Sequence, residues 1–245
     1  MRNLVLDNGN SRLKYALFEQ GRIRDQGFVP APTVPEIVAL ATNLQPENTI
    51  LSSVAREWGE ELANAISVGM QFFELTAQTP LPIQHVYQTP ASLGKDRLAA
   101  VVGAWHLYPG EDCLVVDAGT CITFDLLTAD GVFRGGNIAP GVRMRLRAMH
   151  EYTVRLPLVE PLATGKLLGE QTTEALQNGG PLGAALELEG LYMRLRENYP
   201  HLRVLLTGGD APLLANLLKT KIFVHENLVL QGLNQILEYN VEQLA

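Results

Sequence analysis

The chain of 245 residues contains an internal repeat, and this repeat limits the possible folds more than any other feature. Residues 4–10 read LVLDNGN and recur 110 positions later as LVVDAGT. On the sequence, the offset holds without a gap over positions 4 to 24. Seven positions are identical in the two copies: Leu4, Val5, Asp7, Gly9, Leu17, Gly21 and Arg24. A duplication of this kind predicts two related halves, which we place at residues 1–111 and 112–245.

Each copy has the pattern of three strands followed by helices that alternate with strands. An apolar run ends at an aspartate, a glycine turn follows, and a second run leads through Gly21 or Gly131 into a third. Apolar periodicity and the Pro and Gly positions predict the later elements. The expected helices are 35–44, 57–67, 95–108, 142–152, 171–198 with a break near 179–181, and 227–244; the expected strands are 49–54 and 202–207; residues 78–92 are expected to form an extended loop. The chain is therefore predicted to be an α/β protein with a duplicated β-β-β-α-β-α unit and a shared cleft.

Composition excludes several classes of protein. Hydrophobic residues make up 47% of the chain and charged residues 18%, which is not the balance of a disordered chain. No uncharged apolar run approaches the roughly 18 residues of a membrane-spanning helix, and the apolar run at the N-terminus is too brief for a signal peptide. Two cysteines make no disulfide framework and no Cys/His cluster has metal-ligand spacing, which favours a reducing cytoplasm. The net charge of −7 argues against a nucleic-acid surface.

Two aspartates that end apolar runs, Asp7 and Asp117, are the first candidates for chemistry. Each precedes a glycine turn with free backbone N–H groups, which together with the hydroxyls of Ser11 and Thr120 suit phosphate oxygens. The two carboxylates suit a hydrated magnesium ion or a monovalent cation that neutralises developing charge. A single Asp-x-Gly at a strand end is more often an ordinary turn. Two copies in register favour a pair of hairpins that hold a nucleoside triphosphate from both sides.

Two glycine clusters fit the same nucleotide. Residues 135–141 precede an expected helix, whose N-terminus attracts anions, and residues 207–210 follow an apolar strand and open another helix. Glycines there permit close approach of the backbone to a base and a ribose, although plain strand-to-helix turns use glycines as well. Neither segment matches a P-loop or the dinucleotide fingerprint of a Rossmann fold.

A further candidate segment is Gly94-Lys95-Asp96-Arg97, at the start of an expected helix. The N-terminal dipole favours an ionised Asp96, and Arg97 offers a fork for a carboxylate ligand. A carboxylate that accepts a hydroxyl proton is what a small-molecule kinase requires. The same spacing also fits a helix-capping Asp beside a surface Arg, and the spacing alone does not distinguish the two.

Taken together and in this order, these motifs resemble those of the type III pantothenate kinases, which belong to the superfamily of acetate and sugar kinases, heat-shock ATPases and actin. The resemblance extends over nearly the whole chain. Residues 7–14 resemble the first phosphate motif of the family, 94–99 its pantothenate motif, 117–120 its second phosphate motif, 135–141 its Gly-Gly-x-Ile-x-Pro-Gly and 207–209 its adenosine motif. The resemblance implies a duplicated ribonuclease H-like fold of the actin-like ATPase kind, with two halves around a nucleotide cleft.

The resemblance also implies roles for individual residues. Asp96 would deprotonate the primary alcohol of pantothenate, and Asp117 would bind a monovalent cation, potassium or ammonium, beside the magnesium of ATP. The residues implied to contact pantothenate are Tyr87, Gly94, Lys95, Asp96, Arg97 and Thr172. Those implied to hold ATP are Asp7, Asn8, Gly9, Asn10, Ser11, Arg12, Leu13, Lys14 and Thr120. Ser11 stands where the family usually has Thr, and this exchange keeps the hydroxyl.

The implied activity is the ATP-dependent phosphorylation of pantothenate to 4′-phosphopantothenate, the first step of coenzyme A biosynthesis. The resemblance implies a cytoplasmic homodimer with the pantothenate site at the subunit interface, and neither a nucleic-acid nor a membrane partner is expected. Two alternatives stay open: a non-catalytic regulatory relative, and a kinase of the same superfamily that acts on another hydroxyl substrate. The presence of Asp7, Asp96, Arg97, Asp117 and Thr120 argues against the first, whereas the phosphate motifs alone do not exclude the second.

Overall fold

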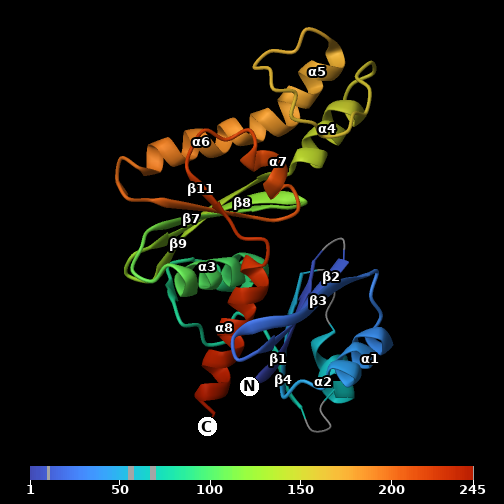
Figure 1. Cartoon of the computed structure of the whole chain (residues 1–245), viewed down its shortest axis with the longest axis vertical. Coiled ribbons are helices and arrows are strands. Elements are labelled where there is room, and N and C mark those ends of the chain that lie inside the picture. The colour runs from blue at the N-terminus through green and yellow to red at the C-terminus, as the bar shows by residue number, and fades with distance from the viewer. Residues whose placement is uncertain (10–11, 55–57, 67–69, 245) are drawn as a thin grey trace. The chain divides into compact units, whose positions relative to one another are not determined.

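The computed structural model describes residues 1–9, 12–54, 58–66 and 70–244 (Figure 1). The chain forms two compact units. Unit 1 comprises Met1–Leu107 and Asn227–Ala245, and unit 2 comprises Tyr108–Glu226. The chain therefore passes between the units twice, once just before Tyr108 and once just after Glu226. Near these two crossings, within unit 2, Tyr108 Oη lies 3.0 Å from Nε2 of His225.

Unit 1 is built on a mixed five-stranded sheet. Its strands are β1 (Arg2–Asn8), β2 (Arg12–Glu19), β3 (Arg22–Pro30), β4 (Asn48–Ser53) and β5 (Gln71–Glu74). Their order in space is β3-β2-β1-β4-β5. β2 lies antiparallel to β1 and β3, whereas β4 lies parallel to β1 and β5. Because β1 and β4 run in the same direction, their carboxyl ends meet at one edge of the sheet, and Asp7 pairs there with Ser52.

Helices pack on both faces of this sheet, as the alternation of side chains along β1 requires. Leu4 and Leu6 point to one face, where they join a core with α1 (Val34–Leu44) and α2 (Gly59–Ile66). Asn3 points to the other face, which α8 (Leu228–Glu242) covers, and α8 packs in turn on α3 (Lys95–Leu107). Two short elements, β6 (Gln84–His85) and the 3-10 turn η1 (Pro90–Ser92), interrupt the segment 78–92 that we expect to be extended.

Unit 2 repeats the sheet of unit 1. Its strands are β7 (Cys113–Ala118), β8 (Cys121–Thr128), β9 (Val132–Pro140), β10 (Arg203–Thr207) and β11 (Ile222–Val224). Read from β9, their order is β9-β8-β7-β10-β11, which matches β3-β2-β1-β4-β5 strand for strand. The directions match as well, because β8 is antiparallel to β7 and β9 while β10 is parallel to β7 and β11. The duplication predicted from the sequence is thus present as two sets of five strands with the same order and directions.

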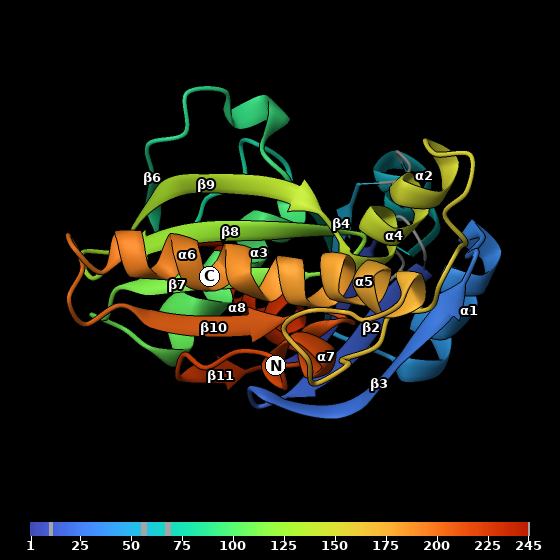
Figure 2. The same cartoon turned by 90° about the horizontal axis from the view of Figure 1, so that it is seen from above.

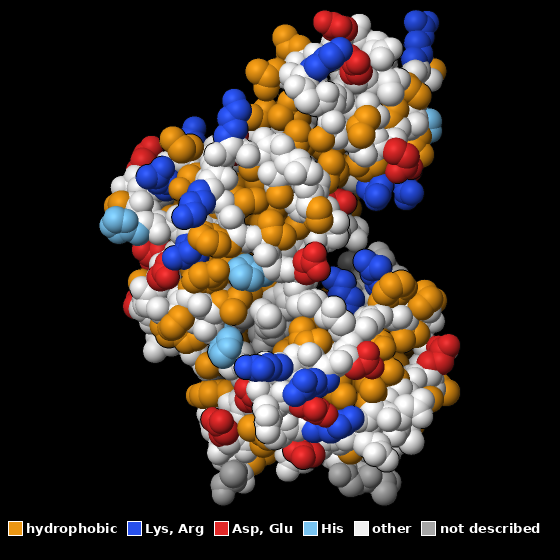
Figure 3. Space-filling view, viewed as in Figure 1, with side chains coloured by type: hydrophobic (Ala, Val, Ile, Leu, Met, Phe, Trp, Pro, Cys, Tyr) orange, Lys and Arg blue, Asp and Glu red, His pale blue; other side chains and the backbone are white. Residues whose placement is uncertain are grey.

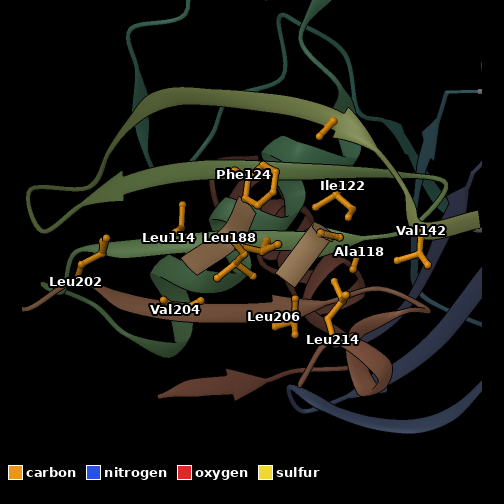
Figure 4. Packing of buried hydrophobic residues seen from close by; sticks show 14 of the residues in the cluster. Leu114, Ala118, Ile122, Phe124, Val142, Leu188, Leu202, Val204, Leu206 and Leu214 are labelled. Atoms are coloured by element: carbon orange, nitrogen blue, oxygen red, sulfur yellow. The ribbon is translucent and has the colours of Figure 1, made fainter. Parts of the chain in front are cut away.

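The helices of unit 2 are α4 (Val142–Glu151), α5 (Thr172–Gln177), the π-helical turn η2 (Asn178–Leu182), α6 (Gly183–Leu195) and α7 (Ala211–Ala215). Figure 2 shows α6 lying along the sheet. Its Leu188 packs with Phe124 and Val204 of the strands and with Leu214 of α7 (Figure 4). The break that the sequence predicts near residues 179–181 is the turn η2, which contains Pro181.

The boundary between the predicted halves differs from the observed one at the C-terminal helix. We place 112–245 in the second half, whereas α8 lies in unit 1. Glycines bring α8 and α3 into contact, because a Cβ at Gly232 would overlap the carbonyl oxygen of Ala99. Buried amides tie the helix to the sheet: Asn48 Nδ2 donates to Asn3 Oδ1, and Asn3 Nδ2 donates to Asn234 Oδ1, both at 3.0 Å.

The offset of the repeat is also not constant along the structure. Asn8 pairs with Leu13 across the first hairpin of unit 1, but its counterpart Ala118 pairs with Ile122, so the turn in unit 2 is one residue shorter. The next turn is one residue longer in unit 2, because Glu19 pairs with Arg22 and Thr128 with Val132. The offset is therefore 110 in the first and third strands and 109 in the second. The identity of Leu17 and Leu127 is not a structural match, since Leu17 occupies the place of Leu126.

The remaining predicted elements are present, with ends that differ by a few residues at most. Glu57 and Ser67, the predicted ends of one helix, lie outside the described residues. The short strands β5 and β11 are not predicted by the sequence pattern, because runs of three or four residues carry too little periodicity. Among the described residues, no helix has both the length and the apolar character that a membrane span needs.

Candidate active site

The aspartate turn of unit 1 lies at the carboxyl end of β1. Asp7 and Asn8 are both buried. Asn8 Nδ2 donates to Ser53 Oγ at 3.0 Å, and the backbone N–H of Val54 donates to the carbonyl oxygen of Asn8 at 3.1 Å. These two bonds fix the end of β1 against the end of β4, so that the carboxylate of Asp7 sits on a rigid edge.

The rest of the first phosphate motif is divided between core and surface. The N–H of Gly9 donates to the carbonyl oxygen of Arg12 at 3.2 Å and closes the turn, whereas Asn10 and Ser11 lie outside the described residues. Arg12 is exposed, with its guanidinium 4.8 Å from the centroid of the Phe28 ring. Leu13 is fully buried in the core of unit 1, so its side chain contributes to packing and only its backbone is left for a ligand. Lys14 follows on β2 and is half-buried.

The aspartate turn of unit 2 is also closed by a backbone hydrogen bond from its glycine, although the turn is one residue shorter. The N–H of Gly119 donates to the carbonyl oxygen of Cys121 at 3.0 Å, as Gly9 does to Arg12. Asp117 is half-buried at the end of β7, and Thr120 is exposed at the tip of the turn. The turn thus presents a carboxylate, backbone N–H groups and a hydroxyl in the combination that suits phosphate oxygens.

Glycines of two other segments pack directly on this second turn. Gly208, which follows β10, has a φ of +95° that side-chain-bearing residues rarely adopt, and a Cβ there would overlap Asp117 Oδ1. Gly141, which precedes α4, lies against the carbonyl oxygens of Gly119 and Thr120 so closely that a Cβ would overlap both. The two glycine clusters singled out in the sequence therefore meet the second phosphate motif within unit 2.

Asp210 follows the Gly208 segment at the start of α7. Its N–H donates to the carbonyl oxygen of Ala118 at 2.9 Å, which holds the segment beside the turn. Burial raises the pKa of the Asp210 carboxyl above its usual range, and the charge of Arg143 opposes that rise. The strand-to-helix connection after β10 is therefore anchored on the turn rather than exposed as a plain loop.

The predicted substrate segment of unit 1 begins α3. Asp96 Oδ1 accepts a hydrogen bond from the N–H of Arg97 at 2.8 Å, and a Cβ at Gly94 would lie 2.5 Å from the same oxygen. Arg97 is only 4% exposed, and its guanidinium lies 5.6 Å from the centroid of the Tyr87 ring. A glycine before the aspartate thus makes room for its carboxylate, and the ring of Tyr87 lies beside the guanidinium of Arg97.

Glu74, which the sequence pattern does not single out, also contacts this segment. Lys95 Nζ lies 3.3 Å from Glu74 Oε1, and both side chains are about two-thirds buried. Glu74 ends the short strand β5, where no local sequence motif marks it.

The predicted site residues are divided between the units. Unit 1 brings Tyr87 and residues 94–97 together, and it also contains residues 7–14. Unit 2 contains Asp117 and Thr120, and it places Thr172 as the exposed first residue of α5. Within the described residues, no three His, Cys, Asp or Glu side chains gather as a metal site. A kinase magnesium ion needs only one or two carboxylates besides the phosphates.

Comparisons with known proteins agree on one family. The model of the type III pantothenate kinase family matches residues 3–194. A type III pantothenate kinase of Phocaeicola vulgatus is 40% identical over 243 residues, which cover 97% of this chain and 98% of the relative. One of Christiangramia forsetii is 39% identical over 243 residues, which cover 98% of this chain and all of the relative.

Solved structures give the fold. A ROK hexokinase from Thermus thermophilus is 15% identical and superposes with a TM-score of 0.56 over 98% of this chain and all of the hexokinase chain. At that identity the likeness concerns the fold alone. Together with the repeated strand order, it shows the duplicated ribonuclease H-like fold of sugar kinases and actin-like ATPases.

Proposed function

Because the chain belongs to the type III pantothenate kinase family, we propose that it transfers the γ-phosphoryl group of ATP to pantothenate. The product is 4′-phosphopantothenate, and the reaction is the first step of coenzyme A biosynthesis. The observation that carries the proposal is the family match over nearly the full length of the chain, with relatives that are about as long. In the reaction the alcohol oxygen of pantothenate bonds to the γ-phosphorus, the bond from that phosphorus to the bridging oxygen breaks, and ADP leaves.

Asp96 is the base in this proposal and accepts the proton of the alcohol. Its Oδ1 accepts the N–H of Arg97, which orients the carboxyl group at the first turn of α3. Gly94 supports this role because any larger residue would crowd the carboxylate.

Arg97 and Tyr87 form the pantothenate-binding side of the site. A guanidinium is suited to the carboxylate of pantothenate, and the ring of Tyr87 beside it limits the positions that the guanidinium can take. Lys95 and Gly94 belong to the same segment. Thr172 offers a hydroxyl from unit 2, at the start of α5.

ATP binding is assigned to Asp7, Asn8, Gly9, Asn10, Ser11, Arg12, Leu13, Lys14 and Thr120, with magnesium bound through the phosphates. Asp117 is proposed to bind a monovalent cation, potassium or ammonium. Hard cations take oxygen ligands. Two oxygens are available here, because Asp117 Oδ1 and the carbonyl oxygen of Ala118 both lie against Gly208. Such a cation would offset the negative charge of the phosphates.

We also propose a cytoplasmic homodimer. Large apolar side chains are exposed at the end of α4 and between α4 and α5 in unit 2, including Tyr152 at 87%, Val154, Leu167 and Leu168 at 83%. Figure 3, which is viewed as Figure 1, shows hydrophobic side chains at the surface of this part of unit 2. An exposed apolar patch of this kind is typical of a subunit interface. Thr172 follows this segment closely, which would bring it to an interface site. Leu168→Asp should shift the protein towards the monomer in size-exclusion chromatography with light scattering.

The test of the function is a coupled ADP-release assay with pantothenate, with and without potassium or ammonium. Asp96→Asn should lower kcat by roughly 10²- to 10⁴-fold, because the alcohol loses its base, while ATP still binds in calorimetry. Wild-type turnover in this variant would contradict the assignment of Asp96 as the base. Turnover by the unmodified protein on another alcohol only would favour a different kinase, and no turnover on any alcohol would favour a regulatory protein.

A further inference from the structure

Glu74 lies where two parts of unit 1 meet the substrate segment. It is the last residue of β5, and its Oε1 lies 3.3 Å from Nζ of Lys95, the first residue of α3. A lysine at the positive end of a helix is unfavourably placed, because its charge has the same sign as the helix terminus. The carboxylate of Glu74 offsets that charge one residue before Asp96.

The carboxylate of Glu74 is held from its other side by α2. Gly59, the first residue of α2, approaches it so closely that a Cβ there would overlap Glu74 Oε2. Gly59 is buried, and the negative charge of Glu74 lies at the N-terminus of a helix, where such a charge is favoured. The carboxylate of Glu74 therefore has Gly59 on one side and Lys95 on the other.

A pocket lies next to the substrate segment, residues 94–97. The pocket has a volume of about 150 Å³, and its lining includes Thr76 and Thr79, which follow β5, together with Leu93 and Leu98. Leu93 and Leu98 flank residues 94–97. Since side chains do not fill this space, packing supports the segment less on this side. The contact of Glu74 with Lys95 joins the end of β5 to the start of α3, and these two residues are close in sequence to Thr76 and to Leu93.

We propose that Glu74 is a positioning residue for phosphoryl transfer: it holds Lys95 and thereby fixes the backbone of residues 94–97 that carries Asp96. This inference rests on the proposed function. Glu74 does not touch the reacting atoms. Its effect is on the geometry of the base, and small displacements of a catalytic group have large effects on rate.

The test compares Glu74→Gln, which removes the charge but keeps the size, with Glu61→Gln, an exposed carboxylate on the same helix α2. Both are measured in the ADP-release assay with the intact protein. We expect Glu74→Gln to lower kcat by about five- to tenfold, with the KM for ATP changed less than about twofold and with Glu61→Gln like the wild type. Lys95→Met should cause a similar loss, and the double variant should lose no more than the worse single variant, because both changes break one interaction.

A second variant moves the carboxylate without removing it. Gly59→Ala should displace the end of the Glu74 side chain and lower kcat in the same direction, whereas the double variant Gly59→Ala/Glu74→Gln should be no slower than Glu74→Gln. A purely structural role would lower the unfolding midpoint and leave kcat unchanged well below that temperature. Wild-type kcat in Glu74→Gln, or additive losses with Lys95→Met, would overturn the inference. Failure of the wild-type protein to turn over pantothenate would instead count against the proposed function.

Discussion

The two units hold equivalent aspartate turns by different means. In unit 1 side chains do so, since Asn8 Nδ2 donates to Ser53 Oγ beside Asp7. In unit 2 the counterpart of Asn8 is Ala118, which has no such group, and the backbone of Gly208 lies directly against Asp117 instead. One strand order thus accommodates both a hydrogen-bonded turn and a turn packed on glycine.

This difference predicts unequal tolerance to substitution. A side-chain hydrogen bond contributes about 0.5 to 1.5 kcal/mol and can be lost without steric conflict. A glycine that both adopts a positive φ and touches a neighbouring carboxylate accepts no side chain at all. Substitutions beside Asp117 in unit 2 should therefore lower stability more than substitutions beside Asp7 in unit 1.

The largest effect is expected from Gly208→Ala. The new Cβ would meet Asp117 Oδ1 and the carbonyl oxygen of Ala118 at an unfavourable φ, which should cost about 2 to 4 kcal/mol of unfolding free energy. We expect kcat/KM for ATP to fall by at least about tenfold, because a displaced Asp117 no longer holds the proposed cation that offsets the charge of the phosphates. Urea unfolding and steady-state kinetics measure the two effects. The stability control is Gly209→Ala, since no atom lies within 4 Å of a Cβ there; equal stability of the two variants would contradict the glycine-packed turn.

A smaller effect is expected from Asn8→Ala, which gives unit 1 the residue that unit 2 has at this place. The change removes one buried hydrogen bond to Ser53 and should cost about 1 to 2 kcal/mol. Asn137→Ala, an exposed position on β9, is the matched control and should change urea unfolding little. If Asn8→Ala proved more damaging than Gly208→Ala, the proposed difference between the units would be reversed.

The smallest effect concerns pH and is expected in unit 2. Burial lowers the pKa of His225, so the folded protein favours the neutral imidazole. The contribution of this group to stability is complete above its ordinary pKa near 6.5 and is lost as the pH falls from there towards the lowered pKa. His225→Gln removes the titration, so its unfolding midpoint should fall less than that of the wild type between pH 7 and pH 5. His201→Gln, at an exposed position, should follow the wild-type curve.

Much of this fold is visible in the sequence because its signals are local. Each aspartate turn combines an apolar strand, a carboxylate and a glycine within about ten residues. The start of α3 is marked in the same way by residues 94–97. Hairpins and helix starts are encoded by neighbouring residues, so reading along the chain finds them.

The features that the sequence conceals depend on partners far along the chain. The apolar stripe of α8 predicts a helix but does not say which sheet it covers, and that is decided by Asn234 meeting Asn3. No local motif marks Glu74, because its partner Lys95 lies 21 residues further along the chain. The shift of the repeat is hidden for another reason: one turn is a residue shorter and the next a residue longer, so the two changes cancel.

The placement of α8 has a consequence for the order of folding during synthesis. Unit 2 is one continuous stretch, residues 108–226, and all of it leaves the ribosome before α8 does. The amide of Asn3 and the glycine of α3 that contact α8 stay uncovered in unit 1 until α8 has been synthesised. Since domains generally fold as units while the chain emerges, the second-encoded sheet should be complete first, and the first-encoded one should close last.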